Sequence, residues 1–307
     1  MTLPLISVAL CTYNGEKYIE AQLNSLIHQT YKYLEIIIVD DGSTDDTAHL
    51  VQQMVANDGR IKFYRNEQNL GFNQNFQKAI GLTTGEYIAI CDQDDIWAEN
   101  KIEILHQHIG DNWLIFSNSS CIDEQDKTLE WNILRDFNFG SRNYKSILLH
   151  NWVTGHTTLF KREFLDYLLP IPPDGYYDWW MGFVALYHNK ITYLDQVLTR
   201  YRIHSASVTQ QEQNITEKAY KLKWLEIVLT MVNNFRQYKN LAAADQLYIN
   251  KLYRALTSKK HSLISFPLLS IINRDYHNFF PDSKQRKPLS RLNFAFKFAK
   301  GFKFLKP

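Results

Sequence analysis

The chain has 307 residues, of which 45% are hydrophobic and 14% aromatic, so it holds enough apolar side chains for a large core. Its three cysteines, Cys11, Cys91 and Cys121, form no CxxC pair and no disulfide-like framework, which predicts a reducing, cytoplasmic setting. No basic region precedes the first apolar run, and no stretch approaches the roughly 18 apolar residues of a membrane span. We therefore expect neither a signal peptide nor a transmembrane helix.

The formal net charge of +2 hides an uneven distribution of charge along the chain. From residue 251 onward, 13 lysine and arginine residues stand against only Asp275 and Asp282. Acidic residues outnumber basic ones in the part before residue 251. We therefore expect an acidic body followed by a basic appendage.

Strand and helix patterns alternate over the first 125 residues. Short apolar runs without alternation are typical of strands buried on both faces, and between them apolar residues recur with helical spacing. The alternation predicts an α/β fold with a mixed, mainly parallel sheet flanked by helices. The predicted strands cover residues 5–11, 35–40, 61–66, 86–91 and 113–119, and the predicted helices cover 19–27, 72–82 and 100–109.

Polar clusters follow three of these strands: "CTYNG", "DDGSTDDT" and "CDQDD". Ligands of open α/β sheets bind outside the carboxyl ends of the strands, so the three clusters predict one site. In the last cluster, Asp92, Asp94 and Asp95 would repel one another by about 4 kcal/mol per pair at about 4 Å and an effective dielectric of about 20. We therefore expect a cation among them. The alternatives are a helix cap for "DDGSTDDT" and a solvated acidic turn for "CDQDD".

These segments resemble a known family. The stretch from "SVALCTYNGEKYIEAQLNSL" to "IIIVDDGSTDDT", together with "NEQNLGFNQNFQKAI" and "GEYIAICDQDDIW", is similar to the nucleotide-sugar-binding half of inverting glycosyltransferases of family 2, which have the GT-A fold. The motifs "VTGHTTLFKREF", "YYDWWMGFVA" and "LTRYRIHSASV" continue the resemblance. The variants present are most similar to bacterial rhamnosyltransferase-like members of surface-polysaccharide biosynthesis.

The resemblance implies a catalytic domain over residues 1–208. Its nucleotide-sugar-binding half would cover residues 1–125 and its acceptor and catalytic-base half residues 126–208. A basic, helical extension would follow over residues 209–307.

The resemblance also implies a nucleotide-sugar donor and a divalent cation, Mn²⁺ or Mg²⁺, which prefers oxygen ligands. Asp94 is then expected to bind the metal together with Asp95 and His204. The alternatives are that Asp95 orients its neighbours and that His204 is structural, as an isolated histidine usually is. Asp92 would face the ribose or a metal-bound water. The other donor-binding positions implied are Thr12, Tyr13, Asn14, Glu16, Asp41 and Gln93, with Tyr13 stacking on a pyrimidine and Asp41 accepting from the base.

On the acceptor side, Asp178 matches the family's general base, which takes the proton of the attacking hydroxyl in a single displacement. The alternative is a carboxylate that interacts with the start of its own helix. Trp179 and Trp180 form either a wall for sugar rings or part of the core. Gly155 and His156 fall where the family shapes the sugar pocket.

The function implied is an inverting, metal-dependent hexosyltransferase. It would move a sugar from dTDP-rhamnose or a UDP-hexose to a hydroxyl of a glycan or lipid-linked oligosaccharide, in the biosynthesis of capsule or of the O-antigen of lipopolysaccharide. Two alternatives stay open: a metal-dependent sugar-nucleotide hydrolase or phosphoryl-transfer enzyme, and a non-catalytic glycan-binding module. The chain contains no P-loop and no GxSxG motif, which counts against the first of these.

The C-terminal segment shows helical periodicity over residues 215–238 and 243–260, which predicts a helical hairpin. In the last 16 residues, Phe294, Phe298, Phe302 and Leu305 fall on one arc of a helix and lysines on the other side. This pattern predicts either a helix in an anionic membrane interface, on the inner face of the plasma membrane, or a helix docked on the body. No nucleic-acid motif is present, and the sequence predicts no oligomeric state.

Overall fold

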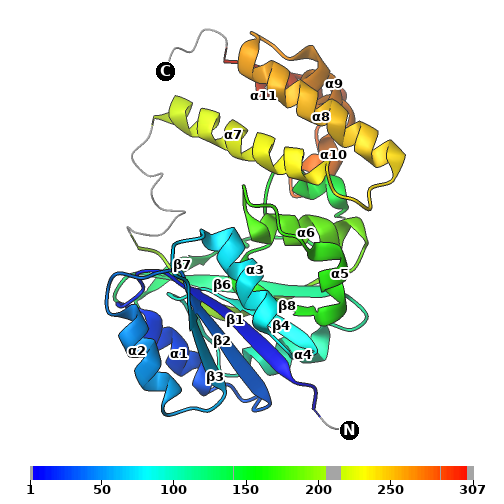
Figure 1. Cartoon of the computed structure of the whole chain (residues 1–307). Coiled ribbons are helices and arrows are strands. Elements are labelled where there is room, and N and C mark those ends of the chain that lie inside the picture. The colour runs from blue at the N-terminus through cyan, green and yellow to red at the C-terminus, as the bar shows by residue number, and fades with distance from the viewer. Residues whose placement is uncertain (1–2, 141, 205–215, 284, 303–307) are drawn as a thin grey trace. The chain divides into compact units, whose positions relative to one another are not determined.

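A computed structural model describes residues 3–140, 142–204, 216–283 and 285–302 of the chain (Figure 1). The chain forms two compact units. The first contains residues 1–135, 153–173 and 188–210, and the second contains residues 136–152, 174–187 and 211–307. The sequence-based division at residue 208 into a catalytic domain and an extension stays a prediction.

The first unit is built on one nine-stranded mixed sheet with the order β3-β2-β1-β4-β8-β6-β9-β5, and β7 pairs with β6. The four strands from β3 to β4 are parallel, whereas β8 pairs antiparallel with both β4 and β6. β6 and β9 are again parallel. The bounds are β1 Ile6–Thr12, β2 Leu34–Asp40, β3 Ile61–Arg65, β4 Tyr87–Cys91, β5 Ile96–Trp97, β6 Leu114–Ile122, β7 Thr128–Asn132, β8 Thr158–Lys161 and β9 Ile191–Arg202.

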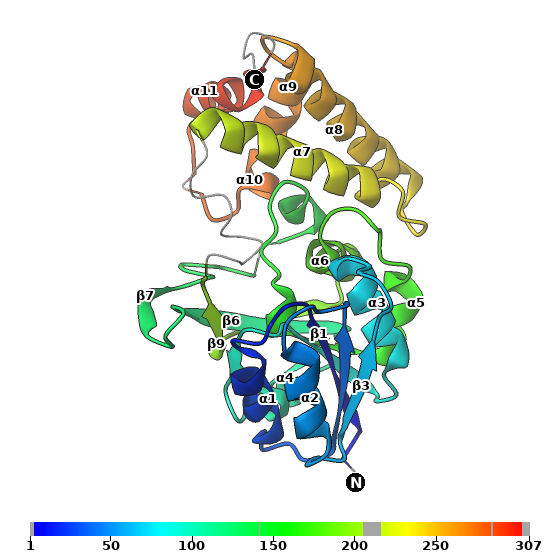
Figure 2. The same ribbon diagram turned by 60° about the vertical axis from the view of Figure 1, so that its left-hand side comes forward.

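Helices cover both faces of this sheet, as Figures 1 and 2 show. Because successive strand residues point to opposite faces, Val8 and Ile36 pack in one core with Leu23 of α1 and Ile102 of α4. Helix α3 contacts β1 and β2 from the other side. The helices are α1 Ile19–Ile27, α2 Thr47–Val55, α3 Phe72–Leu82, α4 Lys101–His108 and α5 Leu165–Leu168, with 3₁₀ turns η1 Tyr144–Ile147 (in the second unit), η2 Gly155–Thr157 and η3 Arg162–Phe164.

The predicted α/β class is confirmed, and each predicted strand and helix of the first 125 residues is present with its ends shifted by at most three residues. Strands β8 and β9 were not predicted. β9 mixes buried and exposed positions without regular alternation, so its sequence lacks the pattern by which a strand is recognised. Both strands position predicted site residues: β8 directly follows the turn that contains Gly155 and His156, and β9 ends two residues before His204.

The second unit is helical within the described residues. Helices α7 and α8 pack against each other, which confirms the predicted hairpin. In the core of this unit, the ring of Phe183 stacks on that of Phe235 with centroids 4.2 Å apart. The helices are α6 Tyr177–Tyr187, α7 Glu217–Phe235, α8 Ala243–His261, α9 Phe266–Arg274, α10 Tyr276–Phe279 and α11 Pro288–Ala299.

The last helix differs from its prediction in two ways. It ends at Ala299, so Phe302 lies beyond it, and Leu305 lies outside the described residues. The phenylalanine face expected to meet a membrane instead packs inside the second unit: Phe294 stands 5.1 Å from the Phe280 ring, and Phe298 stands 5.7 Å from the Trp224 ring. This is the docked arrangement that the sequence left as the alternative. No described helix combines the length and the hydropathy that crossing a bilayer requires.

Candidate active site

The first unit brings three polar segments together at the carboxyl edge of its parallel strands. Strands β1, β2 and β4 are in register, with Thr12 beside Asp40 and Leu10 beside Cys91. The loops that follow these strands therefore start at the same edge of the sheet, where open α/β sheets bind ligands. The predicted donor-binding residues of all three loops consequently lie in one region.

Hydrogen bonds join the loop after β1 to both of its neighbours. The Tyr13 backbone N–H donates to Oε1 of Gln93 at 2.9 Å, and Nε2 of Gln93 donates back to the Tyr13 carbonyl at 3.1 Å. The side chains of Asn14 and Glu16 accept from backbone N–H groups of the loop after β2, at 2.8 and 3.1 Å. These contacts hold the loop while the Tyr13 side chain remains exposed.

Asp41 is buried and organises the turn that precedes α3. Its carboxylate accepts hydrogen bonds from Nδ2 of Asn66 at 2.7 Å and from the backbone N–H groups of Leu70 and Gly71 at 2.8 and 2.9 Å. A carboxylate has about four acceptor positions, so about one is left for a ligand. A contact from Asp41 to a base would therefore use its last acceptor position.

Asp40 acts within its own loop. It is fully buried, accepts from the hydroxyl of Thr12 at 3.1 Å and from the Ser43 backbone N–H at 3.0 Å, and pairs with Arg65 at 3.3 Å. The Thr12 hydroxyl thereby donates to the protein's own carboxylate. Thr12 and Asp40 therefore fix the shape of the loops after β1 and β2, and the exposed Tyr13 lies on the first of these loops.

The end of β9 holds the acidic turn through Asp94. Nε2 of His204 lies 2.8 Å from Oδ2 of Asp94, and the His204 ring stands 5.0 Å from the Tyr18 ring. Arg202, which is buried, donates from Nε to the Asp94 carbonyl at 2.8 Å and pairs with Asp126. The Asp94 side chain keeps 20% of its surface exposed, so a ligand can still reach it.

A second acidic group lies beneath this turn. Nδ1 of His156 stands 3.7 Å from a carboxylate oxygen of Asp92 and 3.7 Å from one of Asp95. The imidazole stacks on Tyr201 with centroids 4.9 Å apart, and its Nε2 lies 2.8 Å from the Ser119 hydroxyl. Oδ2 of Asp95 is buried and has no hydrogen-bond partner among the residues that the structure describes.

Burial and charge shift the pKa values in this second group. Burial raises the pKa of Asp95 to about 7, and repulsion from Asp94 and Asp92 adds to the rise while His156 opposes it. Burial by itself would lower the pKa of His156, but the neighbouring carboxylates of Asp95 and Asp92 outweigh it and raise that pKa above the ordinary value. The imidazole and the Asp95 carboxylate thus stabilise each other's charged forms.

Two separate sets of side chains in this region offer ligands to a cation. The first is the pair Asp94 and His204. The second is Asp92, Asp95 and His156, whose ligand atoms all lie within 4.8 Å of one another. Carboxylate oxygen with one imidazole nitrogen is a donor set that suits a divalent cation, and the unpartnered oxygen of Asp95 leaves an acceptor position to fill.

Lys101, at the start of α4, supports the site from below. It is fully buried; its Nζ donates to the His156 carbonyl at 2.5 Å and to the Thr199 hydroxyl at 2.9 Å, and stands 3.4 Å from the centre of the Trp97 ring. Burial lowers the pKa of Lys101 to about 7. The Lys101 side chain thus connects η2, which contains His156, with β9, which ends just before His204.

Lys101→Met is expected to lower the free energy of unfolding by about 1–3 kcal/mol, because it leaves a buried carbonyl and a buried hydroxyl without their donor. Urea denaturation measures the effect, with the exposed Lys127→Met as the matched control. Methionine keeps the length of the side chain and removes the buried charge. An unchanged or raised stability would mean that the cost of burying the charge exceeds the value of its hydrogen bonds.

The predicted acceptor-side residues divide between the two units. Gly155 and His156 are buried in the first unit. Asp178 lies in the first turn of α6 in the second unit, and its Oδ1 accepts from the backbone N–H of Trp179 at 2.7 Å. Trp179 and Trp180 are buried in the helical core of that unit, where the Trp180 ring stacks on Phe235. Their burial favours the core role that the sequence left open for both.

Sequence reasoning missed two residues that shape the site. Lys101 occupies a helix start that looks solvated in sequence, and only the strands around it bury it. Arg202 lies near the end of a strand that the sequence did not predict, and its guanidinium contacts the Asp94 carbonyl and Asp126. The sequence signal that could have pointed to Lys101 is its position six residues after Asp95, because a buried acidic turn favours a nearby positive charge.

Comparison with known proteins identifies the class. The family model "Glycosyl transferase family 2" matches residues 7–169, more than half of the chain. The chain therefore belongs to glycosyl transferase family 2.

Individual relatives agree with this assignment. An uncharacterised glycosyltransferase of Haemophilus influenzae is 28% identical over 95% of this chain and 99% of its own length. A Campylobacter jejuni protein named GalNAc(5)-diNAcBac-PP-undecaprenol beta-1,3-glucosyltransferase is 27% identical over 78% of this chain and 77% of its own length. The mannosyltransferase PcManGT of Pyrobaculum calidifontis, solved with GDP-Man and Mn²⁺, matches with a TM-score of 0.54 and 18% identity over 96% of this chain and 86% of its own. The last similarity supports the GT-A fold.

Proposed function

We propose that this glycosyltransferase moves a hexose, with inversion, from a nucleotide-sugar donor to a hydroxyl of a glycan or lipid-linked oligosaccharide in cell-surface polysaccharide biosynthesis. Capsule and O-antigen assembly are the processes proposed. The donor is dTDP-rhamnose or a UDP-hexose. The observation that carries the proposal is the acidic turn at the carboxyl edge of the parallel strands, with Asp94 held against His204.

The nucleoside would lie over the loop after β1. Tyr13 is exposed and can stack on a base, while Asn14, Glu16 and Gln93 fix the backbone beneath it. Asp92 lies next to this loop along the acidic turn and is partly exposed, so it can accept from ribose hydroxyls. Asp41 would use its last acceptor position for the base.

A divalent cation, Mn²⁺ or Mg²⁺, would neutralise charge on the departing diphosphate. We assign it to Asp94 and His204 because the Asp94 side chain is 20% exposed, whereas Asp95 and His156 are buried. A cation between the two buried groups would be shielded from a diphosphate. Asp95 then positions the turn, since its Oδ1 accepts from the Arg202 backbone N–H at 3.1 Å. PcManGT, solved with GDP-Man and Mn²⁺, offers a precedent in the same fold.

Asp178 would take the proton of the acceptor hydroxyl as that oxygen attacks the anomeric carbon. Inverting transfer needs one base and one displacement, so a single carboxylate is sufficient. Asp178 is partly exposed in the first turn of α6, so an acceptor hydroxyl can reach its carboxylate.

The protein would act at the cytoplasmic face of the plasma membrane if its acceptor is lipid-linked. The Campylobacter relative is named for an undecaprenol-linked substrate, and it supports an acceptor of that kind here. The same relative is named as a glucosyltransferase and PcManGT as a mannosyltransferase, so neither favours rhamnose over another hexose.

Thermal unfolding with a panel of sugar nucleotides, each with and without Mn²⁺ or Mg²⁺, tests the proposal. A ligand that binds only the folded state adds about 2.7 kcal/mol at a hundredfold excess over its dissociation constant. We expect one donor to stabilise the protein in a metal-dependent way. Stabilisation by none of the donors, with or without metal, would contradict the proposal.

A second experiment separates transfer from hydrolysis and from simple binding. With the stabilising donor and water as the only acceptor, turnover should be slow, and a glycan acceptor should accelerate it. Rapid donor consumption without an acceptor would identify a hydrolase instead. Donor binding without turnover on any acceptor would identify a binding module.

A further inference from the structure

Helix α11 of the second unit has two apolar sides. Phe294 and Phe298 face inward, against aromatic rings of the same unit. Leu289, Leu292 and Phe296 lie on another side of the same helix, within an arc of about 60° at 100° per residue, and all three are exposed. Leu289 is 83% exposed. A soluble helix normally has one apolar stripe, so the outward one needs an explanation.

The start of α9 extends this outward side. The backbone N–H of Gly301 donates to the Leu263 carbonyl at 2.7 Å, and that of Ser265 donates to the Ala299 carbonyl at 3.0 Å. These bonds place the segment before α9 beside the end of α11. Leu263 and Phe266, which are 57% and 69% exposed, therefore lie next to the end of α11. We call this set the apolar strip: Leu263, Phe266, Leu289, Leu292 and Phe296.

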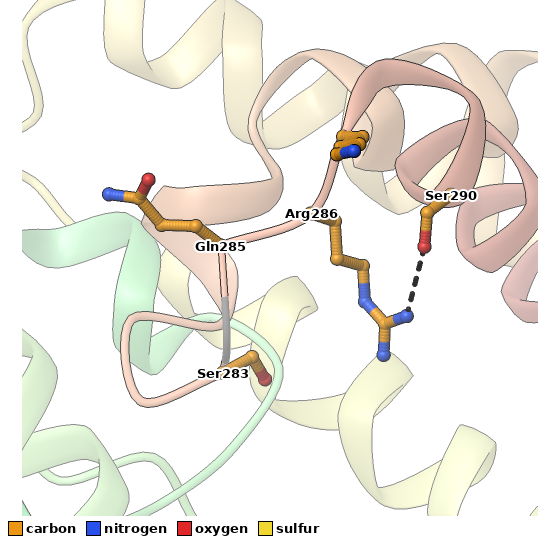
Figure 3. Close-up of a pocket in the computed structure, with 5 residues that line it drawn as sticks. Ser283, Gln285, Arg286 and Ser290 are labelled. Atoms are coloured by element: carbon orange, nitrogen blue, oxygen red, sulfur yellow. Dashed lines mark hydrogen bonds between the residues drawn. The ribbon is translucent and has the colours of Figure 1, made fainter.

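Basic residues border the apolar strip. Lys297 and Lys300 are exposed near the end of α11, and Nζ of Lys300 stands 5.7 Å from the Phe296 ring. Lys287 is exposed at the start of α11 and lines an open pocket of about 440 Å³ together with Ser283, Gln285, Arg286 and Ser290. The Arg286 guanidinium lies on the inner side of the helix, because its Nε donates to the Tyr276 hydroxyl at 2.8 Å and its centre stands 5.0 Å from the Phe294 ring. Figure 3 shows the Arg286 guanidinium directed toward Ser290, to which it donates at 3.4 Å.

The acidic residues of this segment do not neutralise the positive charge of the basic residues that border the apolar strip. After residue 250 only Asp275 and Asp282 are acidic. Asp275 pairs with Lys145 and Arg274, and Asp282 pairs with Arg142. The surface around the apolar strip therefore presents a surplus of positive charge, which selects an anionic partner over a neutral one.

We propose that the apolar strip and its basic border dock on the headgroup layer of an anionic phospholipid bilayer. Apolar side chains flanked by lysine and arginine are the composition of a surface that lies in the membrane interface without crossing it. The leucine and phenylalanine side chains enter the layer, and Lys287, Lys297 and Lys300 contact lipid phosphates. This inference goes beyond the proposed transfer reaction, since neither donor nor acceptor takes part in the docking.

Co-sedimentation of the full chain with vesicles tests the inference. We expect binding to phosphatidylcholine vesicles that contain phosphatidylglycerol, weaker binding at high salt, and none to phosphatidylcholine alone. The pair Leu289→Ser with Phe296→Ser should lower the partition coefficient at least about tenfold, since both side chains lose apolar contact with the layer. The matched control is Leu247→Ser on α8, a leucine that is 56% exposed outside the apolar strip.

The charges are tested separately. Lys297→Gln with Lys300→Gln should lower partition to anionic vesicles by about tenfold or more. Lys251→Gln with Arg254→Gln, on the exposed side of α8, should change it far less. Equal binding to neutral and anionic vesicles, or no effect of the variants in the apolar strip, would overturn the inference.

One further outcome would also overturn it. If Leu289→Ser with Phe296→Ser turns a dimer into a monomer in vesicle-free sedimentation, the apolar strip is an interface between two copies of the chain. All of these measurements omit donor, metal and acceptor. A protein without transferase activity could therefore still bind vesicles, and a protein that does not bind vesicles could still transfer sugar.

Discussion

Asp94→Asn is expected to lower the rate of sugar transfer at least about a hundredfold and to remove the metal dependence of donor binding. Asparagine keeps the shape of the side chain but loses the charge that, with His204, would hold the cation. The Asp94 carbonyl bond to Arg202 does not involve the side chain, so the turn should keep its fold. Initial rates over a metal titration, together with donor-induced thermal stabilisation, measure the effect.

Asp111→Asn is a suitable control for this substitution. Asp111 is exposed and precedes β6, a strand that runs in the same direction as β4, so it lies at the opposite edge of the sheet. It should leave rate and metal dependence unchanged. His204→Gln should weaken metal binding more than His156→Gln does. The reverse order would move the cation to the buried set of Asp92, Asp95 and His156.

Asp178→Asn is expected to lower kcat by about 10²–10⁴-fold while the affinity for the donor stays the same, because a general base acts on the acceptor hydroxyl and not on the nucleotide. Donor-induced stabilisation and steady-state rates, measured on one preparation, separate the two effects. The control is Asp174→Asn, an exposed carboxylate in the turn before α6.

Retention of most of the activity in Asp178→Asn would contradict the assignment of the base. Loss of stability without loss of kcat would instead mean that Asp178 serves the first turn of α6, where it accepts from the Trp179 backbone. Because the variant also removes one charge at a helix start, a stability loss of about 0.3–1 kcal/mol is expected in either case.

The sheet and the position of the site could be predicted from sequence for one physical reason. Parallel strands that are covered on both faces are continuous apolar runs, and the residue at which each run ends marks the edge where ligands bind. Thr12, Asp40 and Cys91 are such ends. By contrast, β8 has only four residues, and the exposure of β9 follows no simple period.

The division of labour among the carboxylates could not be predicted. Asp94 and Asp95 are adjacent in sequence and chemically identical, yet Asp94 is 20% exposed beside His204, whereas Asp95 is fully buried beside His156. Only the strands that pack around the turn decide this difference. The same packing buries Lys101 under the site.

The C-terminal helix shows the same limit. Its amphipathic character could be recognised from its sequence, but α11 carries apolar residues on two sides. Which side turns inward depends on where Phe280 and Trp224 lie, and these residues are 14 and 70 positions before Phe294 in the chain. The phenylalanine side, for which the sequence left a membrane and the protein body as alternatives, is the side that packs inward.

The sequence by itself determined the α/β fold, the family and the edge at which the acidic turn stands, because local periodicity and short-range motifs encode them. The tertiary structure decided that Asp94 stays accessible and that the Lys101 side chain is buried. It also decided which face of the last helix remains exposed. These depend on contacts between residues far apart in the chain, and burial, which sets both pKa and access, exists only once those contacts have formed.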